Sequence, residues 1–161
     1  MRVMSGQVAA VVKSVLLFPF DDSGTTDVDG FVPADPSHFG VSAQVFIGEP
    51  GADDVDSFDI IVCSPAWFAD RAAASESWSL LVSQQHEADS DTVLIGTGLW
   101  FMRSWSAEEL RAVLSTVCSA ASGGPDWGTV ASRIGRAIPW EYDYKYDAHV
   151  DERYGEPFPA T

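Results

Sequence analysis

The chain has 161 residues, 46% of them hydrophobic, and a formal net charge of −15 at pH 7. This hydrophobic fraction excludes global disorder, and the length favours one domain with a substantial core. A negative field of this size repels nucleic acid and anionic lipid and attracts basic proteins, so neither nucleic acid nor a membrane is an expected partner.

The acidic residues are concentrated between Lys13 and Arg71, a stretch that contains no other Lys or Arg. Such a stretch indicates a surface for a basic partner. Acidic, Lys-poor surfaces also arise by adaptation to high salt or from genomic composition bias. The charge alone therefore leaves more than one explanation open.

The first half of the chain is predicted to be rich in strands. Residues 8–18 are apolar and β-branched and indicate a strand. Residues 19–38 contain Asp, Pro and Gly and indicate a long loop, with Phe20, Phe31 and Val32 as its anchors. Residues 40–48 and 55–64 indicate two further strands. The short turn between them predicts an antiparallel hairpin.

The first of these hairpin strands alternates in polarity, which predicts one buried and one partly exposed face. The buried face is expected to carry Val41, Ala43, Val45 and Ile47. After the hairpin, Ser64 and Pro65 are typical of the cap and first residue of a helix. Residues 73–91 give no clear pattern. Residues 92–102 indicate a strand that Gly96 and Gly98 weaken.

The clearest helix is predicted over 107–122. Ser106 and Glu109 form a capping-box pattern before it, and apolar residues recur at intervals of three and four. Its apolar stripe comprises Leu110, Val113, Leu114, Val117, Cys118 and Ala121. A further helix is predicted to begin near residues 125–126 and to end at Pro139. The expected fold is α+β, with a mostly antiparallel sheet of four to five strands and two to three helices.

The C-terminal region after Pro139 contains all four tyrosines of the chain, alternating with acidic residues. In an extended conformation, Trp140, Tyr142, Tyr144 and Tyr146 would face away from Glu141, Asp143 and Lys145. This pattern indicates either an edge strand with one packed aromatic face or part of a binding surface, and the two interpretations are compatible. We assign residues 1–147 to a single domain and residues 148–161 to an acidic tail.

No motif for catalysis, a metal or a cofactor is present. His38, His86 and His149 are scattered, which gives a zinc site little support. The pairs Asp21-Asp22 and Asp53-Asp54 lack the spacing of a calcium loop, and no nucleophile turn is found. Cys63 and Cys118 lie in apolar surroundings and are interpreted as buried thiols. We therefore predict a protein that is not an enzyme.

The N-terminal segment contains Lys13 and lacks a cleavage site of the signal-peptide kind, which favours a cytoplasmic location.

Three stretches, VPADPSHFGVSAQVFIG, SFDIIVCSPAWFA and RIGRAIPWEYDY, resemble the immunity protein 8 family of bacterial polymorphic toxin systems. The resemblance covers residues 8–147. It rests on Phe39, Gly40, Pro65, Trp67, Trp127 and Trp140. Large aromatic residues at such positions are mainly structural, so we expect these six to support the core. The resemblance implies a cytoplasmic, non-catalytic protein that binds and neutralises a toxin encoded beside it.

A toxin that acts on nucleic acid would present a basic cleft, which an acidic inhibitor can reach by electrostatic steering. The predicted contact surface combines the acidic loops with the start of the tyrosine-rich tail. It comprises Asp21, Asp22, Asp27, Asp29, Asp53, Asp54, Asp56, Glu141, Tyr142, Asp143, Tyr144, Tyr146 and Asp147. Two alternatives remain: an adaptor that binds through a sheet edge, and a small hydrolase that uses two carboxylates.

Overall fold

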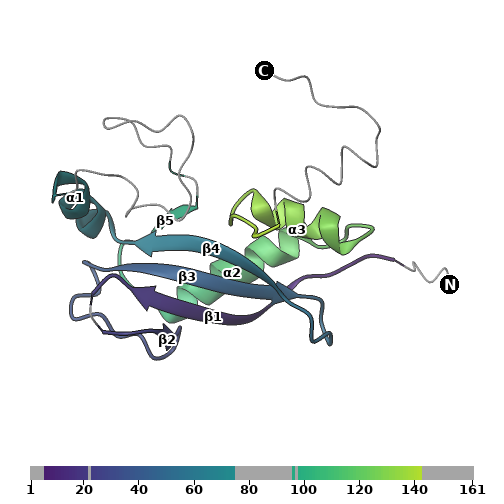
Figure 1. Ribbon diagram of the computed structural model, residues 1–161, viewed down its shortest axis with the longest axis horizontal. Coiled ribbons are helices and arrows are strands. Elements are labelled where there is room, and N and C mark those ends of the chain that lie inside the picture. The colour runs from purple at the N-terminus through teal and green to yellow at the C-terminus, as the bar shows by residue number, and fades with distance from the viewer. Residues whose placement is uncertain (1–5, 22, 75–95, 97, 143–161) are drawn as a thin grey trace, which may run out of the picture.

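The computed structural model describes residues 6–21, 23–74, 96 and 98–142 (Figure 1). Within them a five-stranded sheet has the strand order β2-β1-β3-β4-β5. The elements in chain order are β1 (Val11–Pro19), β2 (Thr26–Asp27), β3 (Gly40–Gly48), β4 (Asp56–Cys63), α1 (Pro65–Ala74), β5 (Leu99–Phe101), α2 (Ala107–Ala121) and α3 (Trp127–Gly135). This arrangement confirms the predicted α+β fold with a mostly antiparallel sheet.

The centre of the sheet is the antiparallel trio β1, β3 and β4. β1 pairs with β3 from Val11↔Gly48 to Pro19↔Val41, and β3 pairs with β4 from Gly40↔Cys63 to Ile47↔Asp56. The four residues predicted for the inner face of β3 are all fully buried, because alternate residues of a strand share one face. The predicted antiparallel hairpin is therefore confirmed.

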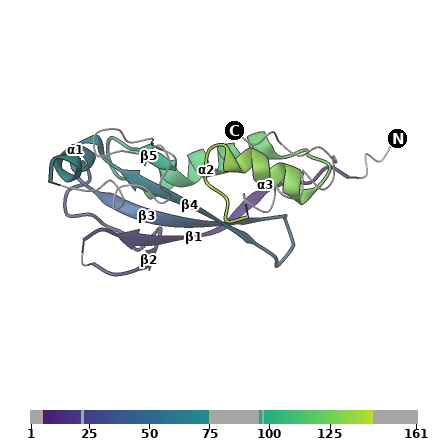
Figure 2. The same ribbon diagram turned by 45° about the horizontal axis from the view of Figure 1, so that its top comes forward.

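α2 and α3 cover one face of this sheet, and the core lies between the two layers (Figure 2). Burial of apolar side chains against the sheet stabilises both helices. Their N-terminal caps match the sequence pattern: Ser106 Oγ accepts from Glu109 N at 3.1 Å, and Asp126 Oδ1 accepts from Thr129 N at 2.7 Å. α1 lies at one end of the sheet (Figure 1), where Ser64 Oγ accepts from Trp67 N at 3.3 Å.

The edge of β4 that faces away from β3 is divided between two segments. Residues near its C-terminal end pair in parallel with β5, from Ile61↔Leu99 to Cys63↔Phe101. Residues near its N-terminal end pair with the segment after α3, through the antiparallel bridge Phe58↔Trp140. β4 is therefore a central strand along its whole length. This explains why it is more deeply buried than alternation alone would predict.

Several expectations are corrected by the structure. Val32 is 85% exposed and does not anchor its loop, and Val113 is 50% exposed and lies off the buried stripe of α2. The loop 19–38 contains the short strand β2, which pairs with Leu16 and Leu17. α3 ends at Gly135, four residues before Pro139, although Ile138 remains fully buried. The ambiguous stretch 73–91 lies mostly outside the described residues, as does the first part of the strand predicted over 92–102.

Cys63 and Cys118 are buried free thiols, as expected. Burial raises the pKa of the Cys63 thiol to about 12 and that of the Cys118 thiol to about 11. None of the helices in the described part of the chain has the length and apolar character needed to cross a membrane.

Candidate partner-binding site

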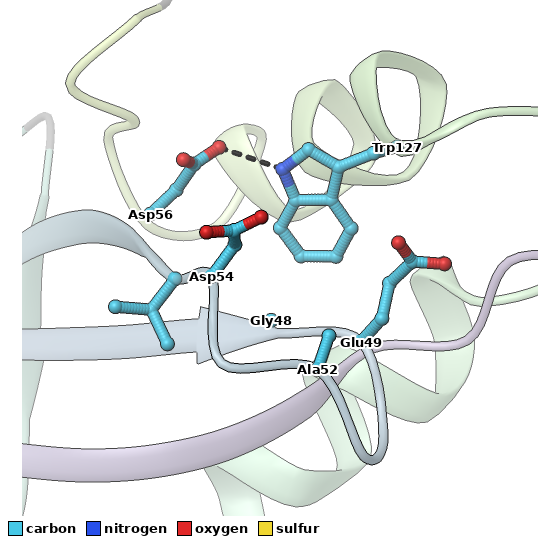
Figure 3. A pocket seen from close by; sticks show the side chains of 7 residues that line it. Gly48, Glu49, Ala52, Asp54, Asp56 and Trp127 are labelled. Atoms are coloured by element: carbon cyan, nitrogen blue, oxygen red, sulfur yellow. Dashed lines mark hydrogen bonds between the residues drawn. The ribbon is translucent and has the colours of Figure 1, made fainter.

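A pocket of about 250 Å³ opens where the β3–β4 turn meets the first residue of α3 (Figure 3). Its walls combine carboxylates from the turn with one large aromatic ring. The lining residues are Gly48, Glu49, Ala52, Asp54, Val55, Asp56 and Trp127. No Lys, Arg or His belongs to this lining, so the pocket joins negative charge to an aromatic surface.

Asp56 holds two indole rings, of which that of Trp127 lines the pocket. It begins β4 opposite Ile47, whose side chain is buried beneath the helices, so its carboxylate also points to the helix side of the sheet. Asp56 Oδ2 accepts a hydrogen bond from Trp127 Nε1 at 2.6 Å and from Trp140 Nε1 at 3.0 Å (Figure 3 shows the first). One carboxylate thereby connects the hairpin, α3 and the C-terminal segment.

The tight turn holds its backbone in place without using the carboxylates. A Cβ on Gly48 would overlap the carbonyl oxygen of Asp54, so only glycine permits this close approach. Gly51 has a φ of +77°, and Ala52 N donates to the Glu49 carbonyl at 3.2 Å. Lys13, at the bulge of β1, donates from Nζ to the Ala52 carbonyl at 3.1 Å. The nearby cation is thus bonded to the backbone of the turn.

The chemistry of this pocket suits a cationic side chain from a partner. Glu49 and Asp54 are exposed acids that lie around the Trp127 ring (Figure 3). An ammonium or guanidinium group over an indole face is attracted by the ring quadrupole, and the carboxylates add charge-assisted hydrogen bonds. Across the part of the chain that the structure describes, no group of three or more His, Cys, Asp or Glu residues could hold a metal ion.

Two members of the predicted surface from the C-terminal segment lie beside this end of the sheet. Glu141 is exposed and its Oε1 accepts from Ser57 N at 2.7 Å. Tyr142 packs edge-on against Trp140, with 6.0 Å between ring centroids. Burial, and secondly the charge of Glu141, raises the pKa of nearby Asp59. Acidic groups thus continue from the turn along β4.

The other predicted acidic residues lie elsewhere. Asp21 follows β1 at the opposite end of the sheet, and a nine-residue strand spans about 30 Å. Asp27 belongs to edge strand β2, and Asp29 forms an ion pair with Arg111 of α2. Of the remaining predicted surface, Asp53 and Asp54 lie in the turn, while Asp22, Asp143, Tyr144, Tyr146 and Asp147 lie outside the described residues.

The residues on which the family resemblance rests make packing contacts within the fold. Phe39 is buried against Phe31 and Trp105, and Pro65 is the first residue of α1. A Cβ on Gly40 would overlap the Trp67 ring.

Trp140 is 6% exposed and stacks on Phe58, in agreement with a core role. Trp127 is only half-buried and contributes a face to the pocket, which the sequence did not indicate.

Glu49 was also absent from the predicted site, although it precedes the same acidic turn. A signal for it was available, because hairpin geometry brings both ends of a short turn together. The role of Trp127 had no local signal, since its partner Asp56 is 71 positions away in the sequence.

The sequence model for the immunity protein 8 family matches residues 20–144 of the chain. No curated protein and no solved structure gives a significant match to the chain.

Proposed function

The chain belongs to the immunity protein 8 family, and we propose that it binds and neutralises a cognate bacterial toxin protein without chemistry of its own. The family match over residues 20–144 carries this proposal. We place the protein in the cytoplasm of the toxin-producing cell, where the toxin is made. The toxin would be encoded beside this gene, as the family's association with polymorphic toxin systems implies.

The charge of the protein suggests how the toxin is recognised. A net charge of −15 attracts a basic partner over distances approaching the Debye length, and this raises the association rate. The pocket at the β3–β4 turn would then receive a Lys or Arg side chain against Trp127, between Glu49 and Asp54. Glu141 and Tyr142 extend the proposed surface towards the C-terminal segment.

The first experiment is calorimetric binding to the toxin domain encoded beside the gene, at low and at raised salt. We expect tight binding that weakens as salt increases, because screening reduces attraction between exposed charges. Tight binding that is insensitive to salt would retain the toxin as partner but remove electrostatic steering. Absence of binding at both salt concentrations would refute that toxin as the partner.

Matched charge reversals test the pocket. We expect Glu49→Lys with Asp54→Lys to weaken toxin binding about tenfold or more, since like charges would then face the basic side chain. The control is Glu108→Lys with Glu109→Lys in the first turn of α2, which makes the same change in net charge elsewhere. Equal losses from both double variants would show that only net charge matters and that the pocket is not the site.

A further inference from the structure

The sheet face opposite α2 and α3 carries its own set of side chains. The register places Phe18, Ser42 and Ile61 in one row across β1, β3 and β4. The next rows contain Leu16, Gln44 and Asp59, and then Ser14, Phe46 and Ser57. This is the near face in Figure 1, where α2 runs behind the sheet. We call these nine residues the open face.

The open face combines apolar groups with acids. Phe18 is 40% exposed, and Leu16 and Phe46 are half-buried without belonging to the core between sheet and helices. On β4, Ile61 is only 2% and Ser57 only 8% exposed, so the accessible apolar part of the face lies over β1 and β3. Asp59 lies on the face itself, and Glu141 borders it because it pairs with Ser57. No member of the open face is Lys or Arg. Apolar side chains on β1 and β3 beside acids at the β4 side form a composition suited to binding a basic protein partner.

Charge selects among the possible occupants. A second copy of this chain would bring another −15 charge against an acidic face, which costs electrostatic free energy. The chain's own segment 75–95 contains Glu76, Glu87, Asp89 and Asp91 and no Lys or Arg, so its sequence offers no such cation to the acids of this face. A basic partner gains from both the apolar and the acidic groups.

We infer that the open face is a docking surface for the basic toxin, with Phe18, Leu16 and Phe46 as apolar anchors and Asp59 and Glu141 as charged contacts. This inference rests on the proposed function. It adds a second contact area, which lies across the sheet from the turn pocket and meets the surface proposed above at Glu141. Aromatic anchors contribute much of the affinity of protein interfaces, whereas acids at the margin mainly steer association.

The test inserts a large cation on the middle strand of the open face, beside Phe18. In Ser42→Arg, the new side chain lies between Phe18 and Ile61 and both blocks and repels a basic partner. The matched control is Val113→Arg on α2, which adds the same charge to a half-exposed position on the helix layer. Phe18→Ser provides a second variant that removes an anchor without adding charge. Circular dichroism and thermal melting would select folded variants.

We expect Ser42→Arg to weaken toxin binding at least tenfold, Phe18→Ser several-fold, and Val113→Arg less than twofold. Binding by both open-face variants that equals the Val113→Arg control would overturn the inference while leaving the toxin as partner. A wild-type protein that does not bind the toxin would overturn both proposals. Concentration-dependent dimerisation that Ser42→Arg abolishes would assign the face to a second copy and likewise overturn the inference.

Discussion

Asp56 lies at the end of a strand, yet its carboxylate is predicted to make a large contribution to the stability of the protein. In Asp56→Ala, the Nε1–H groups of Trp127 and Trp140 both lose their acceptor. Trp140 is 6% exposed, so its unpaired donor costs about 1–3 kcal/mol. Trp127 is half-buried and regains water, which limits its loss to about 1 kcal/mol. We therefore expect the free energy of unfolding to fall by about 3 kcal/mol.

Urea denaturation measures this change. With a slope of about 2 kcal/mol per molar, the midpoint should fall by about 1.5 M. Asp56→Asn keeps an acceptor oxygen but loses its charge, so about 1 kcal/mol should be lost. Asp53→Ala, an exposed carboxylate in the same turn, provides the control and should change stability by less than about 0.5 kcal/mol. An Asp56→Ala protein as stable as Asp53→Ala would refute the reasoning.

Two further predictions follow from the titration of the half-buried Asp59 and of two buried thiols. The pKa of Asp59 is raised by burial and by Glu141, so protonation of this carboxyl favours the folded protein over the unfolded chain. The associated stability is complete below the unfolded pKa and is lost as pH rises through the folded one. Asp59→Asn should therefore stabilise the protein at pH 7 and have little effect at pH 3. Urea denaturation at the two pH values would measure both changes in stability. An equal effect at both pH values would contradict this prediction. The thiols of Cys63 and Cys118 should resist an aromatic disulfide reagent at pH 8 in the native protein and react in urea, because burial raises the pKa of each. Rapid labelling of the native protein would contradict the second prediction.

Local sequence patterns predicted the elements whose conformation depends on residues close to one another in the sequence. β3 was found at its predicted bounds, because Val41 and Ile47 alternate with polar residues on a strand that is buried on one face. α2 was found to within one residue, because Ser106 caps it and its stripe has helical spacing. The exposure of Val113 could not be inferred, since the width of a buried stripe depends on how closely the helix approaches the sheet.

The contacts at the site that join residues far apart in the sequence could not be predicted from the sequence. The acidity of the turn was evident, and the hairpin that presents it followed from turn length. Nothing local indicated that Asp56 bonds two indoles from distant segments, or that the edge of β4 is shared between β5 and Trp140. Such pairings depend on how the helices cross the sheet, and a single sequence contains no local signal for that geometry.

The shared edge of β4 also determines when the protein is complete during its synthesis. The strands β1, β3 and β4 lie early in the chain and can pair as soon as Cys63 has left the ribosome. Trp127 and Trp140, the donors to Asp56, are translated much later. A message with a stop codon before Pro139 would encode most of the sheet and the pocket lining but would lack Trp140, one of the two indoles that Asp56 holds. Under the proposed function, protection of the producing cell begins only when translation of this chain is nearly finished.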